Sequence, residues 1–169
     1  MFGALRVADN LETARRPAPD GSVYVVQCIP KLVSRIAPDG EITTIAEGTP
    51  LNCPNGLSFG TDGRLYVVNF RNGAMIRIDL PSGAMTVHAE IPGGGNGHLA
   101  SASGRFYVAS FRGHRIYEVG MDGQVCLLAG SGEKGNRDGP AASATFFRPN
   151  GVALSADGDL LFTNTVTSI

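Results

Sequence analysis

Three asparagine–glycine pairs recur at matching positions and are the residues of this chain best suited to chemistry. Asn55, Asn96 and Asn150 are each followed by glycine, and each lies eight residues before a second glycine that marks a turn. Amide oxygens are hard, neutral ligands that suit Ca²⁺ or Mg²⁺. If the pairs open equivalent strands, their side chains ring one mouth of a central channel. We therefore predict a divalent-metal site, with Ca²⁺ as the favoured ion, at these asparagines, with Asn55 and Asn96 also binding substrate. The alternative is that Asn-Gly serves only as a turn dipeptide that tolerates left-handed backbone.

A histidine close to the second pair is the candidate catalytic base. His98 follows Asn96 by two residues, so both side chains share one face of an extended strand. There it could activate water for attack on a carbonyl group. Its counterparts in the other copies are Leu57 and Val152, which are packing residues. A histidine that merely packs within the fold is therefore the alternative interpretation.

A weak repeat with a period near forty residues positions the asparagines. Its turn glycines are Gly21, Gly63, Gly104 and Gly158, at spacings of 42, 41 and 54 residues. Turn–strand–turn–strand units of this length are typical of propeller blades, which bury themselves only against further copies. The second strands, such as 65–70, are apolar on both faces and need a layer on each side. The sequence therefore predicts an all-β fold of four-stranded antiparallel blades.

The repeats fill the chain without completing a closed ring. We predict one domain over 1–169, with blades near 13–48, 54–91, 96–130 and 149–169, the last of them incomplete. The smallest closed propellers have about four blades. A partial β-propeller is therefore expected, and its uncovered ends predict self-association of the chain.

Two stretches resemble known families. The segment 148–162, Arg-Pro-Asn-Gly-Val-Ala-Leu-Ser-Ala-Asp-Gly-Asp-Leu-Leu-Phe, resembles an NHL repeat. The segment 53–67, Cys-Pro-Asn-Gly-Leu-Ser-Phe-Gly-Thr-Asp-Gly-Arg-Leu-Tyr-Val, resembles the senescence-marker-protein/gluconolactonase family. The resemblance implies a fragment of a six-bladed propeller that hydrolyses a small lactone or ester with a divalent metal in its channel. In that family the metal is held by asparagine and acidic residues.

The chain departs from the family pattern at the first blade. The position that matches the family's acidic ligand is Thr13, with Glu12 beside it, and no aspartate or glutamate falls on the asparagine positions. A cation held only by neutral oxygens binds weakly. The rival hypothesis is a non-catalytic NHL-type scaffold that binds a protein or small ligand on the propeller face.

Composition narrows the choice of partners. A net charge of −1 and a charged content of 17% give no pull toward nucleic acid or an anionic membrane, so a small-molecule substrate or ligand is expected. No secretion signal is visible at the N-terminus, which predicts a cytoplasmic location. We expect Cys28, Cys53 and Cys126 to be small buried apolar residues. His88 and His114, in an outer strand and a turn, are expected to be solvated.

Overall fold

The computed structural model describes residues 15–164, which form β-strands joined by turns and loops and contain no helix. Glu12 and Thr13 lie outside the described residues. Within the described part of the chain there is accordingly no helix long and apolar enough to cross a membrane.

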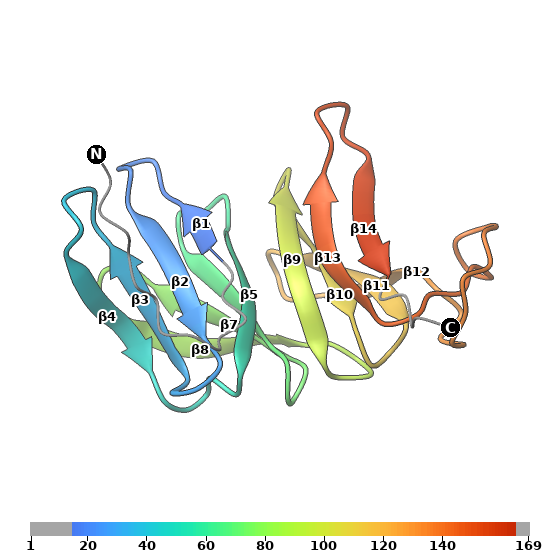
Figure 1. The fold of residues 1–169 in the computed structure, drawn as a ribbon, viewed down its shortest axis with the longest axis horizontal. Coiled ribbons are helices and arrows are strands. Elements are labelled where there is room, and N and C mark those ends of the chain that lie inside the picture. Colours follow the sequence, from blue (N-terminus) through green and yellow to red (C-terminus); the bar gives the residue numbers. More distant parts are fainter. Residues whose placement is uncertain (1–14, 165–169) are drawn as a thin grey trace.

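The strands form consecutive antiparallel sheets, each built from neighbours in the sequence (Figure 1). Three sheets have four strands and the last has two. The first contains β1 (Arg15–Pro17), β2 (Val23–Gln27), β3 (Leu32–Ile36) and β4 (Ile42–Glu47). The second contains β5 (Pro54–Phe59), β6 (Leu65–Asn69), β7 (Ala74–Asp79) and β8 (Ala84–Glu90). The third contains β9 (Asn96–Ala102), β10 (Arg105–Ser110), β11 (Arg115–Gly120) and β12 (Val125–Ala129), and the fourth contains β13 (Pro149–Leu154) and β14 (Leu160–Asn164).

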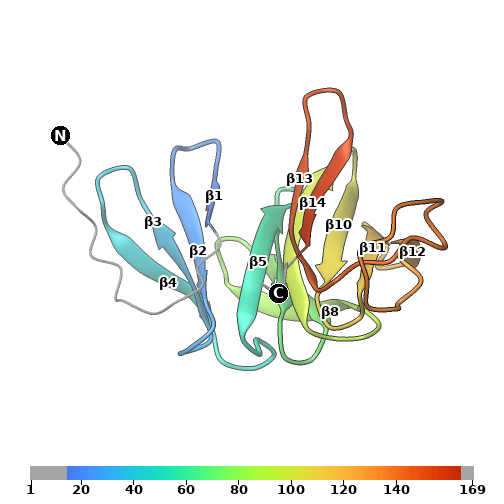
Figure 2. The same ribbon diagram turned by 45° about the vertical axis from the view of Figure 1, so that its right-hand side comes forward.

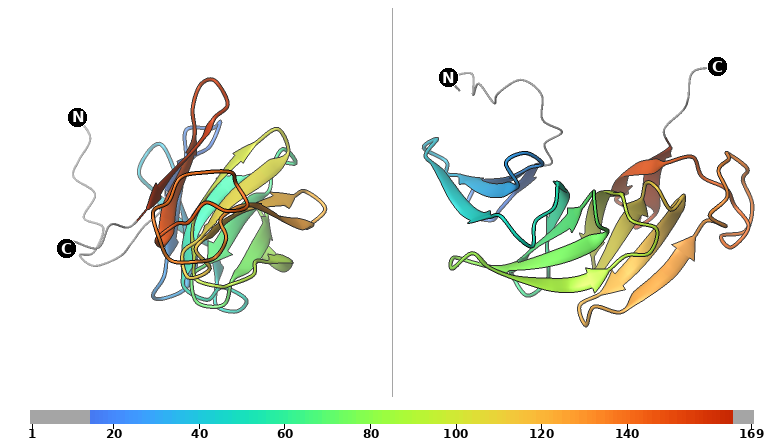
Figure 3. Two further views of the ribbon diagram at one scale, coloured as in Figure 1. Left: turned by 90° about the vertical axis from the view of Figure 1, so that its right-hand side faces the viewer. Right: turned by 90° about the horizontal axis from the view of Figure 1, so that it is seen from below.

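The sheets stand side by side along an arc, with their first strands on its concave side (Figure 3, right). Apolar clusters fill each junction between adjacent sheets. Val26 and Leu57 belong to the first cluster, Val68 and Phe106 to the second, and Ile116 and Phe146 to the third. The second strand β6 is fully buried because a sheet lies on either side of it, whereas β14, in the last sheet, alternates between half-buried and exposed residues. The prediction of an all-β partial propeller with four-stranded antiparallel blades is confirmed.

The repeat aligns in register as well as in sequence. Tyr24, Tyr66 and Tyr107 occupy the second strands of successive sheets, and each is paired with the residue eleven positions later on the third strand. The alignment on the turn glycines therefore identifies structurally equivalent positions.

The expectation for the cysteines was wrong. Cys28 and Cys53 form a disulfide bond, and Cys126 is a free cysteine with an exposed side chain. The bonded pair joins the turn after β2 to the residue before β5. Their separation of 25 residues gave no signal in the sequence, because only the packing of the first two blades brings these two loops together.

The two histidines that were expected to be solvated are half-buried instead. His88 Nε2 donates to the carbonyl oxygen of Gly120 at 2.9 Å, and its ring packs edge-on against Tyr66. His114 stacks on Phe147, and its Nδ1 accepts a hydrogen bond from the backbone of Arg148. Both rings fill junctions between neighbouring blades, which the sequence repeat alone does not show.

The alternation of strand direction gives the molecule two ends (Figures 1 and 2). We call one the asparagine end; β5, β9 and β13 begin there, and it carries the turns between second and third strands and the loops between blades. The other, which we call the aspartate end, carries the turns within strand pairs one–two and three–four, most of them built on Asp-Gly.

Candidate functional site

Glycine follows Asn55 and Asn96 because neighbouring first strands approach closely at the asparagine end. A Cβ atom on Gly56 would lie 2.9 Å from the Cα atom of His98, and one on Gly97 would lie 2.6 Å from the carbonyl oxygen of Asn150. Real side chains do not tolerate such contacts with backbone atoms. Gly56 and Gly97 are therefore required for the packing of blade against blade, in addition to any role that Asn55 and Asn96 have at a binding site.

The asparagines begin strands whose pairing is irregular. The register shifts between Pro54 and Gly56 in β5 and between Pro149 and Val152 in β13. Irregularities of this kind redirect one side chain out of the regular alternation. Asn55 and Asn150 therefore need not follow the inward and outward pattern of the strands that they open.

Asn55 and Asn96 use their amide nitrogens to join the second and third blades. Asn55 Nδ2 donates to the backbone oxygen of Asn96 at 3.3 Å, and Asn96 Nδ2 donates to the backbone oxygen of Gly73 at 2.8 Å. Asn96 is fully buried, and its Oδ1 atom has no hydrogen-bond partner. Buried polar atoms are nearly always paired, so this oxygen is a position where a ligand or water is expected.

The remaining predicted site residues lie on the adjoining strands. Asn150 and His98 are half-buried, and both lie beside glycines of the neighbouring blade. The structure thus brings the three asparagines onto three adjacent strands at one end of the molecule.

These residues fit a divalent cation only in part. They offer neutral amide oxygens, including the unpaired oxygen of Asn96. Among residues 15–164 no three His, Cys, Asp or Glu side chains are grouped so as to hold a metal ion. The described residues therefore offer a Ca²⁺ ion at this end no cluster of acidic ligands, which tight binding favours.

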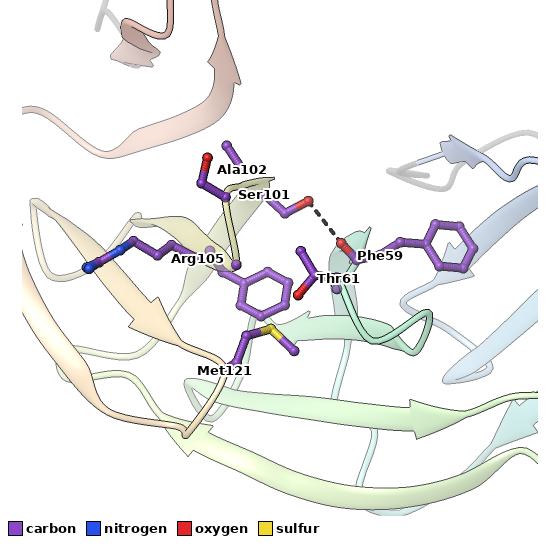
Figure 4. Close-up of a pocket in the computed structure, with 10 residues that line it drawn as sticks. Phe59, Thr61, Ser101, Ala102, Arg105 and Met121 are labelled. Atoms are coloured by element: carbon purple, nitrogen blue, oxygen red, sulfur yellow. Dashed lines mark hydrogen bonds between the residues drawn. The ribbon is translucent and has the colours of Figure 1, made fainter.

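Two cavities that reach the first strands lie away from the three asparagines. One, of about 220 Å³, opens at the aspartate end between the second and third blades, where Phe59, Thr61, Arg105 and Met121 line it (Figure 4). The other, of about 300 Å³, lies along the first strands and is lined by Ser58, Ala100, Ser101 and residues 152–154. Ser101 lines both cavities and donates a hydrogen bond to the backbone oxygen of Phe59 at 2.9 Å, while its hydroxyl also contacts that of Ser58.

The aspartate end carries compact ion-pair networks. Burial alone would raise the pKa of Asp62, but hydrogen bonds from the backbone and side chain of Arg64 and from the Tyr66 hydroxyl hold that pKa below its ordinary value. Burial and the adjacent carboxylate raise the pKa of Tyr66 to about 12. These groups stabilise a turn. Their pKa values are shifted away from neutral pH, whereas a catalytic acid or base needs a pKa close to it.

A row of alternating cations and aromatic rings crosses the asparagine end, and sequence reasoning missed it. Arg112 lies over the Phe70 ring, which contacts Phe111. Arg148 lies 5.5 Å from the centre of Phe111 and 5.4 Å from that of Phe147, and Lys134 lies 4.5 Å from Phe147. We call these six residues the cation–aromatic row. Phe70 and Phe111 follow the second strands of successive blades, a repeated position that could have signalled part of the row.

Comparison with known proteins identifies the fold. No family model matches the sequence, and no curated protein matches it significantly. Solved structures do match. A virginiamycin B lyase from Staphylococcus aureus aligns with a TM-score of 0.72 at 17% identity, over 94% of this chain and 50% of its own. A chain of a nidogen/laminin complex aligns with a TM-score of 0.71 at 17% identity, over 90% of this chain and 55% of its own. The chain is part of a β-propeller.

A third match is to a proposed gluconolactonase, with a TM-score of 0.69 at 14% identity, over 93% of this chain and 57% of its own. The architecture is thus the one that the resemblance to gluconolactonase-like and NHL-repeat proteins predicts. This part of a propeller spans about half the length of the solved structures that it matches. At these identities the likeness shows the fold, and the activity must be argued from the chain's own residues.

Proposed function

We propose that this part of the propeller is a binding scaffold whose recognition surface is the asparagine end. The observation that carries the proposal is the use of the Asn55 and Asn96 amides, which bridge blades through backbone carbonyls. Residues committed to holding blades together make a rigid platform, and the loops around them are then free to vary for recognition.

Hydrolysis of a small lactone or ester is the second candidate function. It is favoured by the unpaired, buried Oδ1 atom of Asn96, which could accept a hydrogen bond from a ligand or contact a cation. His98, half-buried beside Gly56, remains its candidate base. A Ca²⁺-dependent form of this activity would need an acidic ligand in addition to these residues.

Calcium binding and hydrolysis separate the two candidates. We would measure the melting temperature with and without Ca²⁺, and the hydrolysis of a panel of lactones and esters, for the chain and for Asn150→Ala. Asn136→Ala, in the loop before β13, is the matched control. The scaffold predicts no Ca²⁺ shift that depends on Asn150 and no hydrolysis. A Ca²⁺ shift that Asn150→Ala abolishes and Asn136→Ala preserves, together with turnover, would replace the scaffold with the hydrolase.

A further inference from the structure

The two ends of the molecule carry opposite charge. Among the described side chains, the aspartate end holds nine acidic residues and four arginines, whereas the asparagine end holds seven basic residues and four acidic ones. The basic residues of the asparagine end are Lys31, Arg71, Arg112, Arg115, Lys134, Arg137 and Arg148. The near-neutral net charge of the whole chain therefore hides a basic face at the asparagine end and an acidic face at the aspartate end.

The arginines of the two ends are held in different ways. At the aspartate end Arg35, Arg64 and Arg77 pair with aspartates. In the cation–aromatic row, Arg112 and Lys134 are exposed and form no ion pair with any residue of 15–164, and aromatic rings hold them instead. A guanidinium stacked on a ring keeps its N–H groups available in its own plane for a carboxylate or phosphate.

Arg148 occupies a backbone conformation that does not favour arginine. Its φ is +49°, and the residues two positions before the other asparagines, Cys53 and Gly94, also have positive φ values of 56° and 59°. The blade entry thus requires left-handed backbone, which costs a non-glycine residue about 1–2 kcal/mol. Glycine meets the need without strain at position 94, and Cys53 is held by its disulfide. An arginine here is explained by what its side chain does, because the backbone would favour glycine.

The row is built to bind anions rather than flat rings or small molecules. Phe147 is already covered by His114, Lys134 and Arg148, so its faces are not free to stack on a nucleobase. The two cavities described above are lined by other residues, and small ligands bind in cavities. A row whose cations are exposed, and which neither of these two cavities reaches, suits an extended chain that carries negative charges.

We propose that the cation–aromatic row docks an extended acidic segment of a partner protein. The proposal rests on the scaffold function and names the partner's chemistry. Arg148 and Lys134 lie over the same ring, each within 5.4 Å of its centre. In an extended peptide, side chains two residues apart lie on the same side at about 7 Å. Glutamates at alternate positions could therefore contact Arg148 and Lys134 together, and Arg112 extends the surface across the neighbouring blade.

Arg148→Gly separates docking from folding. The probe is a fluorescent ten-residue peptide of alternating glutamate and serine, and binding to the 169-residue chain is followed by anisotropy. Arg148→Gly should raise the Kd about 3- to 10-fold, the effect of losing one charge-assisted contact. It should change the melting temperature little, because the relief of backbone strain offsets the loss of the contacts that Arg148 makes with Phe111 and Phe147. Arg112→Gln should weaken binding similarly, whereas Arg105→Gln, at the aspartate end, should not.

Three outcomes would overturn the proposal. The first is equal binding of a peptide with glutamine in place of glutamate. The second is an Arg148→Gly Kd equal to that of the unsubstituted chain in a protein that is still folded. The third is tighter binding of single-stranded dT10 than of the acidic peptide, which would assign the row to nucleic acid. None of these results changes the Ca²⁺ and hydrolysis measurements, so a failed docking site and a failed scaffold are distinguishable.

Discussion

The two ends of this propeller are built by different means. At the aspartate end, short-range bonds dominate: Asp39, Asp62 and Asp122 each accept a hydrogen bond from the backbone N–H two residues later. At the asparagine end the bonds span much longer distances in the sequence. Asn55 reaches a residue 41 positions away, and the disulfide joins residues 25 apart. The aspartate end therefore adds local turn bonds to contacts between blades such as that of Ser101 with Phe59, whereas the asparagine end relies mainly on long-range contacts.

Removing the disulfide should have the largest effect. Replacing both Cys28 and Cys53 by serine releases a loop of 25 residues at the asparagine end, which should lower the free energy of unfolding by about 2–4 kcal/mol. Urea denaturation measures the loss. Cys126→Ser, at an exposed free cysteine, is the control and should be neutral. Equal stability of the double variant and the control would show that the covalent link is not what holds the first two blades together.

Gly97→Ala should have the second largest effect on stability. The added methyl group would lie 2.6 Å from the carbonyl oxygen of Asn150, on backbone that cannot yield without moving a blade. Overpacking of this kind costs about 1–3 kcal/mol. The same denaturation experiment measures it, with Ala153→Ser on the exposed side of β13 as the comparison. A neutral Gly97→Ala would mean that the first strands are less tightly packed than the structure shows.

Protonation of Asp62 should lower the stability of the fold at the aspartate end, and it should do so only at low pH. Because hydrogen bonds hold the folded pKa of Asp62 below its ordinary 3.8, its contribution to stability is present above pH 3.8 and is lost as the pH falls further. Asp62→Asn should make the free energy of unfolding depend less on pH below 3.8. It should also lower the pKa of Tyr66 from about 12 while leaving it above 10, because burial is the larger cause of the increase. NMR of labelled tyrosine measures the pKa, and an unmoved value would contradict the contact.

The smallest effect on stability is expected from the protonation of His114 at the asparagine end. It should occur at a higher pH than the protonation of Asp62. Burial lowers the pKa of His114, and the nearby charges of Arg148 and Lys134 lower it further. The stability that the neutral ring contributes is present above pH 6.5 and is lost as the pH falls through the folded pKa. Arg148→Gly should raise this pKa slightly, as read from the NMR signals of the ring. Lys31→Gln, at a turn of the first blade, should not change it.

The sequence was most informative where structure is local. Glycine spacing, Asp-Gly turns and strands that are apolar on both faces predicted the blades, and the equivalent tyrosines lie in register. The asparagine positions were also visible, because each precedes its turn glycine by eight residues, the length of one strand and the start of the turn that follows it. Their chemistry was not visible, because the partners of Asn55 and Asn96 are backbone carbonyls of other residues brought near by folding.

The amino-acid sequence was enough to predict β-propeller blades, since period, turn residues and apolar pattern are properties of each repeat. Folding of the whole chain set which loops share an end. It thereby joined Cys28 to Cys53, collected Arg112, Lys134 and Arg148 on aromatic rings, and separated the basic face from the acidic one. The physical reason is that ion pairs, cation–π contacts and disulfides all require their residues to be close in space. Residues far apart in the sequence become neighbours only when the blades stack.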